Sequence, residues 1–123
     1  MAPPVATIFQ ARGIDQRRES RVVMAAYVLV DISQTDPERA ARYRAMSGPS
    51  VERHGGRFLA RGGAIRQLEG DWQPERLVII EFTSAEAAQA WFDSEDCRQA
   101  RSVRAGAGVW RMVVVDGISP DPT

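Results

Sequence analysis

The chain has 123 residues, which is enough for one domain with a single core and too few for a second domain of ordinary size. Its 16 basic and 16 acidic residues balance, and every basic residue is arginine. Without an excess of positive charge, the composition argues against nucleic acid or an anionic membrane as a partner. The apolar runs are strand-sized, far short of the ~20 residues that span a bilayer.

The two ends of the chain lack the hydrophobic periodicity of its middle. Residues 1–23 hold a Pro-Pro pair and no basic stretch ahead of an apolar core, so we expect a loose extension and no secretory signal. Residues 119–123 contain alternating prolines and predict a short tail. Cys97 has no second cysteine to pair with, which fits a reducing compartment. The sequence thus predicts a cytoplasmic protein with one domain over residues 24–118.

Four segments are rich in the β-branched and aromatic residues that favour strands. Three of them are apolar at both odd and even positions, which is typical of strands covered on both faces. The second strand leads through a glycine pair into a long connection. The strands are expected at residues 26–32, 57–61, 76–82 and 109–118.

The segment between the first two strands predicts a helix in two pieces. Thr35 is expected as its N-cap, with Glu38 completing a capping box. Pro37 suits the first turn, because its missing N–H is not needed there. Gly48-Pro49 is expected to break the helix, and the second piece should end at His54, before a pair of glycines.

The segment after the third strand predicts a second helical region with the same kind of start. Thr83 is expected as the N-cap and Glu86 as the other half of a capping box. Ser94 permits a kink into a second piece, which Gly106 ends. The inner side carries an apolar stripe made of Ala87, Ala88, Trp91 and Phe92.

The order βαββαβ predicts an α+β, ferredoxin-like fold, with a four-stranded antiparallel sheet and both helical regions on one face. The other face has no cover, although the first, third and fourth strands are apolar on it as well. An exposed apolar face of this size favours burial against a second copy of the chain. We therefore expect a homodimer that packs sheet to sheet.

Five short blocks follow one another along the chain: AYVLVDI at residues 26–32, HGG at 54–56, RGG at 61–63, LEGDW at 68–72 and IEF at 80–82. Taken together, they resemble the DUF1330 family, small bacterial proteins of undefined function in the dimeric α/β-barrel superfamily. The likeness extends from Met24 to Ile118 and implies a barrel shared by two chains, with no established chemistry. Related families include cofactor-independent monooxygenases, muconolactone isomerases and haem-dependent chlorite dismutases, whose activities transfer only by analogy.

Three residues are candidate catalytic groups. His54, the only histidine, could be a general base beside a pocket, or it could bond a last helix carbonyl in a structural role. Arg61 and Glu81 are charges in neighbouring, otherwise apolar strands, and each needs a partner or water. They could supply an anion-binding guanidinium and an acid/base carboxylate. Alternatively they form ion pairs at the rim, in which Glu81 meets Arg57 instead of Arg61.

Four further residues are candidate ligand-binding groups. Tyr27 and Tyr43 each combine a ring that fills space with a hydroxyl that can donate to a ligand. Asp31, at the end of the first strand, has the same two interpretations as Glu81. Trp72, in the long connection, could cover a pocket or clasp a second subunit.

The sequence argues against several other kinds of site. No phosphate-binding glycine motif has the required strand and helix around it, and one histidine with one cysteine gives no metal-ligand spacing. No hydroxyl or thiol side chain is visibly placed beside the histidine as a nucleophile, and no haem motif surrounds it. We therefore expect neither a metal nor a cofactor.

Two functions fit these residues. The first is a cofactor-independent acid/base enzyme, an isomerase or a monooxygenase-like catalyst, acting on a small organic molecule between the sheet and the helices of each subunit. The second is a non-catalytic small-molecule-binding or dimeric assembly module, in which the same charges hold the dimer together.

Overall fold

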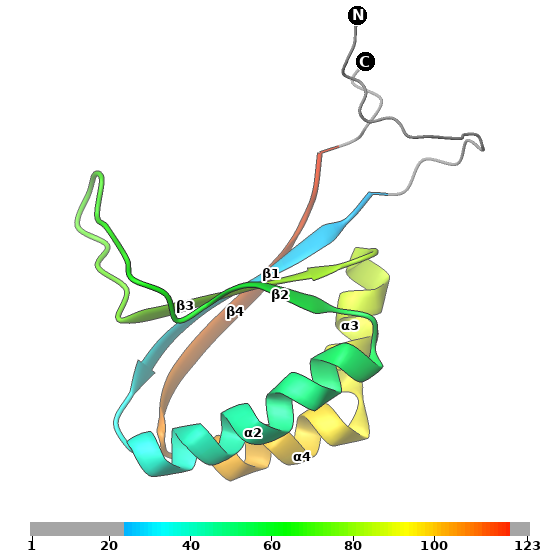
Figure 1. The fold of residues 1–123 in the computed structure, drawn as a ribbon, viewed down its shortest axis with the longest axis horizontal. Coiled ribbons are helices and arrows are strands. Elements are labelled where there is room, and N and C mark those ends of the chain that lie inside the picture. The colour runs from blue at the N-terminus through cyan, green and yellow to red at the C-terminus, as the bar shows by residue number, and fades with distance from the viewer. Residues whose placement is uncertain (1–23, 119–123) are drawn as a thin grey trace, which may run out of the picture. The chain divides into compact units, whose positions relative to one another are not determined.

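In the described part of the chain, residues 24–118 of a computed structural model, seven elements follow the order strand, helix, strand, strand, helix, helix, strand (Figure 1). The extension and tail expected at residues 1–23 and 119–123 lie outside the described residues. The βαββαβ prediction is confirmed, with its second helical region divided in two. The strands are β1 (Ala26–Gln34), β2 (Arg57–Arg61), β3 (Arg76–Phe82) and β4 (Gly108–Asp116). The helices are α2 (Pro37–Arg53), α3 (Ala85–Asp93) and α4 (Glu95–Arg104).

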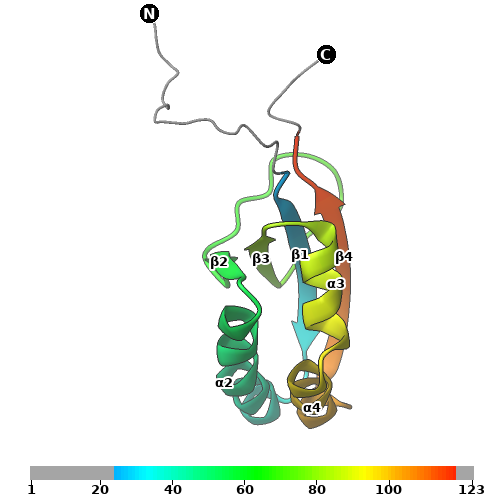
Figure 2. The ribbon, with the colours of Figure 1, turned by 90° about the vertical axis from the view of Figure 1, so that its right-hand side faces the viewer.

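The described strands form one antiparallel sheet in the order β2-β3-β1-β4, which is the ferredoxin-like topology. At its centre, Val28 of β1 pairs with Ile80 of β3 on one side and Val114 of β4 on the other. A shift of register between Phe58 and Ala60 marks a bulge in β2. All three helices lie on one side of the sheet (Figure 1), with α3 against β1 and β4 and α2 towards β2 (Figure 2). The expected fold class, with one covered face, is confirmed.

Both helical regions begin one residue later than expected. Asp36, not Thr35, is the N-cap of α2, and its Oδ1 accepts a backbone N–H of the first turn at 3.1 Å. Thr35 instead donates its backbone N–H to the carbonyl of Ala107 at 2.8 Å, which ties this residue to the chain before β4. Ser84 caps α3 in place of Thr83 and accepts a first-turn N–H at 3.0 Å. In each case the cap is the extended residue directly before the first helical one.

The expected break at Pro49 is wrong, because α2 continues through it from Pro37 to Arg53. A proline inside a helix costs about 3 kcal/mol. The buried residues Tyr43 and Val51 lie on either side of Pro49, and burying both along one helix outweighs that local cost. The predicted stop is confirmed, since His54 is the C-cap and the following glycine has φ +79°. No helix within residues 24–118 is long and apolar enough to cross a membrane.

The core lies between the sheet and the helices. Trp91 of α3 is 1% exposed, and its ring lies 5.5 Å from that of Phe82 at the end of β3. The indole Nε1 donates to Ser50 Oγ at 3.0 Å, so this buried polar group has a partner. The sheet contributes a cluster of alternating residues to this core, namely Val28, Val30, Ile32, Val78, Ile80 and Phe82.

The face of the sheet opposite the helices, called the open face here, is also largely apolar. Leu29 of β1 lies on it between Ile79 of β3 and Val113 of β4, and Val113 is 62% exposed. Two acidic residues, Asp31 and Glu81, alternate with these apolar residues on the same face. The prediction that β1, β3 and β4 are apolar on both faces is confirmed.

Gly56 is a position at which the core has no room for a side chain. A Cβ there would lie 2.7 Å from Phe82 Cε1 and 2.9 Å from Val51 Cγ1. Gly56→Ala should therefore lower the free energy of unfolding, measured by urea denaturation, by about 1–3 kcal/mol, as overpacking does. Gly63→Ala is the matched control, because a Cβ there has nothing within 4 Å, and its effect should stay within about 0.5 kcal/mol. Equal stability of the two variants would contradict this packing.

Candidate functional site

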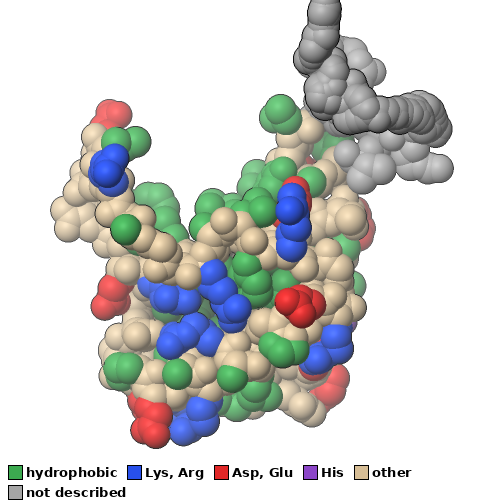
Figure 3. Space-filling view, in the orientation of Figure 1, with side chains coloured by type: hydrophobic (Ala, Val, Ile, Leu, Met, Phe, Trp, Pro, Cys, Tyr) green, Lys and Arg blue, Asp and Glu red, His purple; other side chains and the backbone are tan. Residues whose placement is uncertain are grey.

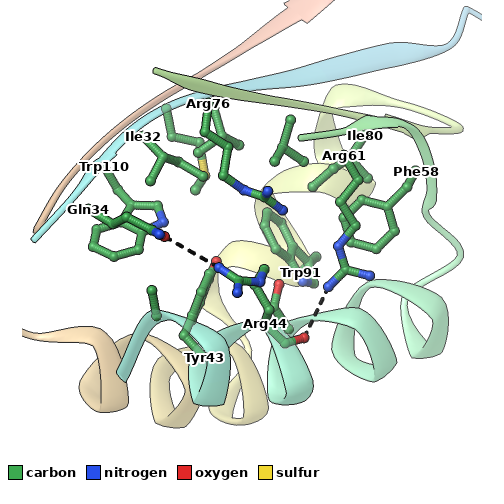
Figure 4. A pocket seen from close by; sticks show the side chains of 15 residues that line it. Ile32, Gln34, Tyr43, Arg44, Phe58, Arg61, Arg76, Ile80, Trp91 and Trp110 are labelled. Atoms are coloured by element: carbon green, nitrogen blue, oxygen red, sulfur yellow. Dashed lines mark hydrogen bonds between the residues drawn. The ribbon is translucent and has the colours of Figure 1, made fainter. Parts of the chain in front are cut away.

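A pocket opens between α2 and the helix face of the sheet (Figure 4). It exists because α2 packs mainly along α4 and stands away from the strands. One side of α2 lines it, through Ala40, Tyr43, Arg44 and Ser47, which follow the three- and four-residue spacing of a helix face. The cavity itself is narrow, with a volume of about 30 Å³, and it opens to solvent at its mouth.

Most of the lining is apolar or aromatic. Aromatic rings enter from α2, β2, α3 and β4, and those of Tyr43 and Trp110 meet edge to face with their centroids 5.7 Å apart. Rings arranged in this way favour a flat apolar body over a bulky polar one. The floor is formed by the strand residues Val30, Ile32, Val78, Ile80 and Met112.

Arginine side chains from three elements point into this pocket: Arg44 of α2, Arg61 of β2 and Arg76 of β3 (Figure 4). The guanidinium of Arg61 lies 4.1 Å from the centroid of the Phe58 ring and donates to the backbone carbonyl of Arg44 at 3.0 Å. Arg44 Nη1 donates to Gln34 Oε1 at 3.4 Å. Basic side chains accordingly gather between the sheet and α2 on the face seen in Figure 3.

The charge of this arginine cluster, Arg44, Arg61 and Arg76, is not compensated by the described residues. No carboxylate lines the pocket, and no described carboxylate lies within 4 Å of the three guanidinium groups. Burial, and then the positive charges of Arg44 and Arg61, lower the pKa of Arg76. Arg76 Nε is buried without a hydrogen-bond partner. The cluster therefore has the chemistry of an anion site, since guanidinium groups bind carboxylates and phosphates through paired hydrogen bonds.

Two glycines leave room for these guanidinium groups. A Cβ on Gly48 would lie 3.3 Å from Arg61 Nη1, closer than ordinary van der Waals contact. A Cβ on Gly62, which has φ +78°, would overlap the guanidinium of Arg76. A glycine inside a helix costs about 0.5–1 kcal/mol relative to alanine, so Gly48 weakens α2 locally while admitting Arg61 to the pocket.

The structure does not bring the three candidate catalytic residues together. Arg61 lines the pocket, and so does the candidate ligand-binding residue Tyr43. Glu81 lies on the open face, where its Oε1 accepts from Arg57 Nε at 2.6 Å. This is the ion pair with Arg57 that was expected as the alternative to a catalytic role. His54 caps the end of α2, and its Nδ1 lies 2.9 Å from a carbonyl oxygen in the last turn. The arginine and the two candidate acid/base groups thus occupy three different places.

The other candidate ligand-binding residues belong to the open face. Tyr27 lies directly opposite Glu81 in the ladder between β1 and β3. Asp31 Oδ2 accepts from Arg111 Nη2 at 2.9 Å and from Trp72 Nε1 at 3.1 Å. Trp72 is 56% exposed, so the long connection presents its ring at this face and not at the pocket.

Sequence reasoning missed Arg44 and Arg76. A signal for each was present, because both follow the period of their element. Arg44 comes four residues after Ala40 on the inner side of a helix. Arg76 comes two residues before Val78, so alternation along the strand turns it to the helix face. Within residues 24–118 no group of three His, Cys, Asp or Glu side chains could hold a metal ion, and a cationic pocket is unsuited to one.

Solved structures share this fold at low sequence identity. A protein of unknown function from Rhodopseudomonas palustris is 23% identical, with a TM-score of 0.64, over 79% of this chain and 85% of that one. A dimeric ferredoxin-like protein of unknown function from Thermobifida fusca is 16% identical, with a TM-score of 0.52, over 76% and 89%. A protein from Nitrosomonas europaea, provisionally named an antibiotic biosynthesis monooxygenase, is 17% identical, with a TM-score of 0.51, over 83% and 97%. These likenesses support the fold and not a reaction.

The sequence itself identifies the family. No curated protein matches the chain. The family model of DUF1330, a domain of unknown function, matches residues 25–118, which include every described strand and helix. The chain therefore belongs to the DUF1330 family.

Proposed function

We propose that this protein binds a small organic anion with an apolar body in the pocket between α2 and the sheet. One observation carries the proposal: Arg44, Arg61 and Arg76 converge on an aromatic pocket in which no described carboxylate pairs with them. The guanidinium groups would hold the anionic head through charge-assisted hydrogen bonds, and the aromatic lining would hold the body.

The pocket supports binding more directly than it supports acid/base catalysis. An isomerase or a monooxygenase-like catalyst needs a group that takes or gives a proton beside the substrate. Neither His54 nor Glu81 lines the pocket, and the hydroxyl groups that line it belong to Tyr43 and Ser47. We therefore place small-molecule binding first and a cofactor-independent enzyme second.

We further propose that two copies of the chain pack through their open faces as a homodimer. Leu29, Ile79 and Val113 form an apolar row across three strands, and a face of this kind is rarely left to water. Asp31 and Glu81 already pair with arginines of their own chain, so burying the face leaves no acidic group there without a partner. The dimeric state named for the Thermobifida fusca protein supports the proposal.

The binding proposal predicts selective stabilisation by carboxylates. Benzoate should raise the melting temperature of the full chain in scanning calorimetry, whereas benzamide, which has nearly the same shape and no charge, should not. A ligand at about 100 times its Kd adds about 2.7 kcal/mol to the free energy of unfolding. Arg44→Gln should weaken benzoate binding about tenfold, because it removes a charge-assisted hydrogen bond.

Arg98→Gln is the matched control for this experiment, since Arg98 has the same charge but lies exposed on α4, away from the pocket. Its affinity for benzoate should equal that of the unaltered protein. Equal stabilisation by benzoate and benzamide, or none by any carboxylate, would overturn the binding proposal.

Arg76→Met should stabilise the unliganded protein and weaken its binding of benzoate. The substitution keeps an apolar stem in place and removes a charge that burial and two neighbouring arginines oppose. We expect a gain of about 0.5–2 kcal/mol in the free energy of unfolding, because binding sites often keep destabilising charges for function, and removing such a charge stabilises the fold. Urea denaturation with and without benzoate measures both effects. A loss of stability without ligand would mean that Arg76 is a structural cation.

The dimer proposal predicts a particle of twice the 13.6 kDa chain mass in light scattering. Val113→Glu should give single chains, because it buries a carboxylate in the proposed interface. Met46→Glu, the same kind of change at a 37% exposed residue of α2, should leave the dimer intact. A single-chain mass for the unaltered protein at tens of micromolar would overturn the proposal.

A further inference from the structure

Two buried nitrogens that line the pocket have no hydrogen-bond partner among the described residues. They are Arg76 Nε and Trp110 Nε1. Buried donors are nearly always satisfied, and a pocket leaves that to water or to a ligand. A third such nitrogen, Arg104 Nη1, belongs to a side chain that does not line the pocket. Since Arg76 is one of the converging arginines, the donor that anion binding alone does not explain is the indole of Trp110.

The indole of Trp110 is held in place beside the arginine cluster. Figure 4 shows it next to Gln34, at the same end of the pocket as Arg44. Its ring meets that of Tyr43 edge to face, and the guanidinium of Arg104 lies 4.6 Å from its centroid. Gln34 Oε1 accepts from Arg44 at 3.4 Å, so the side-chain oxygen beside the indole already has a donor. Trp110 Nε1 is thus a fixed donor that needs an acceptor close to the guanidinium groups.

The donors around this cavity outnumber the acceptor sites of a plain carboxylate. A guanidinium group carries five N–H groups, whereas the two oxygens of a carboxylate offer about four lone-pair sites. Two arginines that each form paired hydrogen bonds with it fill all of these sites. The third arginine and the indole of Trp110 then keep donors without an acceptor. A further oxygen on the ligand removes this deficit.

The size of the cavity determines where the further oxygen lies on the ligand. A volume of about 30 Å³ holds about two or three water-sized groups, because each needs about 10–15 Å³. An oxygen on a remote atom of the ligand would therefore lie outside the cavity. An oxygen on the carbon next to the carboxylate stays beside it, and the apolar body of the ligand lies towards the mouth.

We propose that the ligand is a 2-oxo or 2-hydroxy carboxylate with an apolar body, and that Trp110 Nε1 donates to its 2-oxygen. This inference rests on the proposed anion binding and adds the class of anion and a binding residue to it. The carboxylate lies among Arg44, Arg61 and Arg76, and the uncharged oxygen accepts from the uncharged donor. Guanidinium groups bind the charged oxygens more strongly than an indole does, which favours this division of the donors.

Calorimetric titration of the full chain with phenylglyoxylate, mandelate and phenylacetate tests the 2-oxygen. All three have the same ring and carboxylate and are ionised at neutral pH, and phenylacetate lacks the oxygen. We expect phenylglyoxylate or one enantiomer of mandelate to bind about tenfold more tightly than phenylacetate, since the buried donor otherwise stays unsatisfied.

Trp110→Phe locates the effect, because it keeps an aromatic ring and removes the donor. The preference over phenylacetate should fall to about onefold in this variant. It should persist in Trp72→Phe, the matched control, whose indole donates to Asp31 away from the pocket. A preference that persists in folded Trp110→Phe would overturn the assignment of Trp110 as the donor.

Equal affinities for all three compounds would overturn the inference, whether or not the variant folds, and would leave the proposed function standing if benzoate still binds. Inorganic phosphate also brings more than two oxygens to one centre, but it has no apolar body. Binding of phosphate as tight as that of phenylglyoxylate would overturn the assignment of a carboxylate. Failure of all these anions and of benzoate to bind would overturn both this inference and the proposed function.

Discussion

The rest of this structure depends on keeping the helix face of β1 and β3 away from water. Val28, Val30 and Ile80 alternate on that face and are at most 4% exposed. α3 covers them with the ring of Trp91, whereas α2 packs along α4 and stands off the strands. The space that α2 leaves is the pocket, and side chains from all four strands reach it. The candidate site is therefore a product of helix packing and not of one sequence motif.

Charge is distributed unevenly in a chain whose net charge is zero. Two acidic residues of the sheet form ion pairs on the open face, where Asp31 meets Arg111 and Glu81 meets Arg57. The pocket on the other face keeps its arginines without such partners among the described residues. Repulsion within this cluster opposes folding, and a bound anion would relieve it. A local requirement for an anion can thus exist in a protein whose overall charge suggests no charged partner.

Strand positions could be predicted closely, and β2 and β3 begin and end at the expected residues. β3 is a run that is apolar on both faces, which has few alternatives, and β2 lies between two pairs of glycines. Local rules failed at Pro49, where burial of the surrounding helix outweighs a preference of the backbone. Arg61 and Tyr43 could be found as site residues, because a charge inside a strand and a ring on an inner helix position stand out. The period of their elements turns Arg44 and Arg76 inward, but this signal alone does not mark them as site residues, because arginines are usually solvated and only the displacement of α2 brings these two together.

Uncompensated arginines in an aromatic pocket should bind an organic carboxylate. A crystal structure of the full chain with 4-bromobenzoate tests this, because the anomalous signal of bromine locates the ligand. We expect a bromine peak inside the pocket and carboxylate oxygens about 2.7–2.9 Å from guanidinium nitrogens of at least two of Arg44, Arg61 and Arg76. A pocket that holds only water, with bromine elsewhere or nowhere, would contradict it.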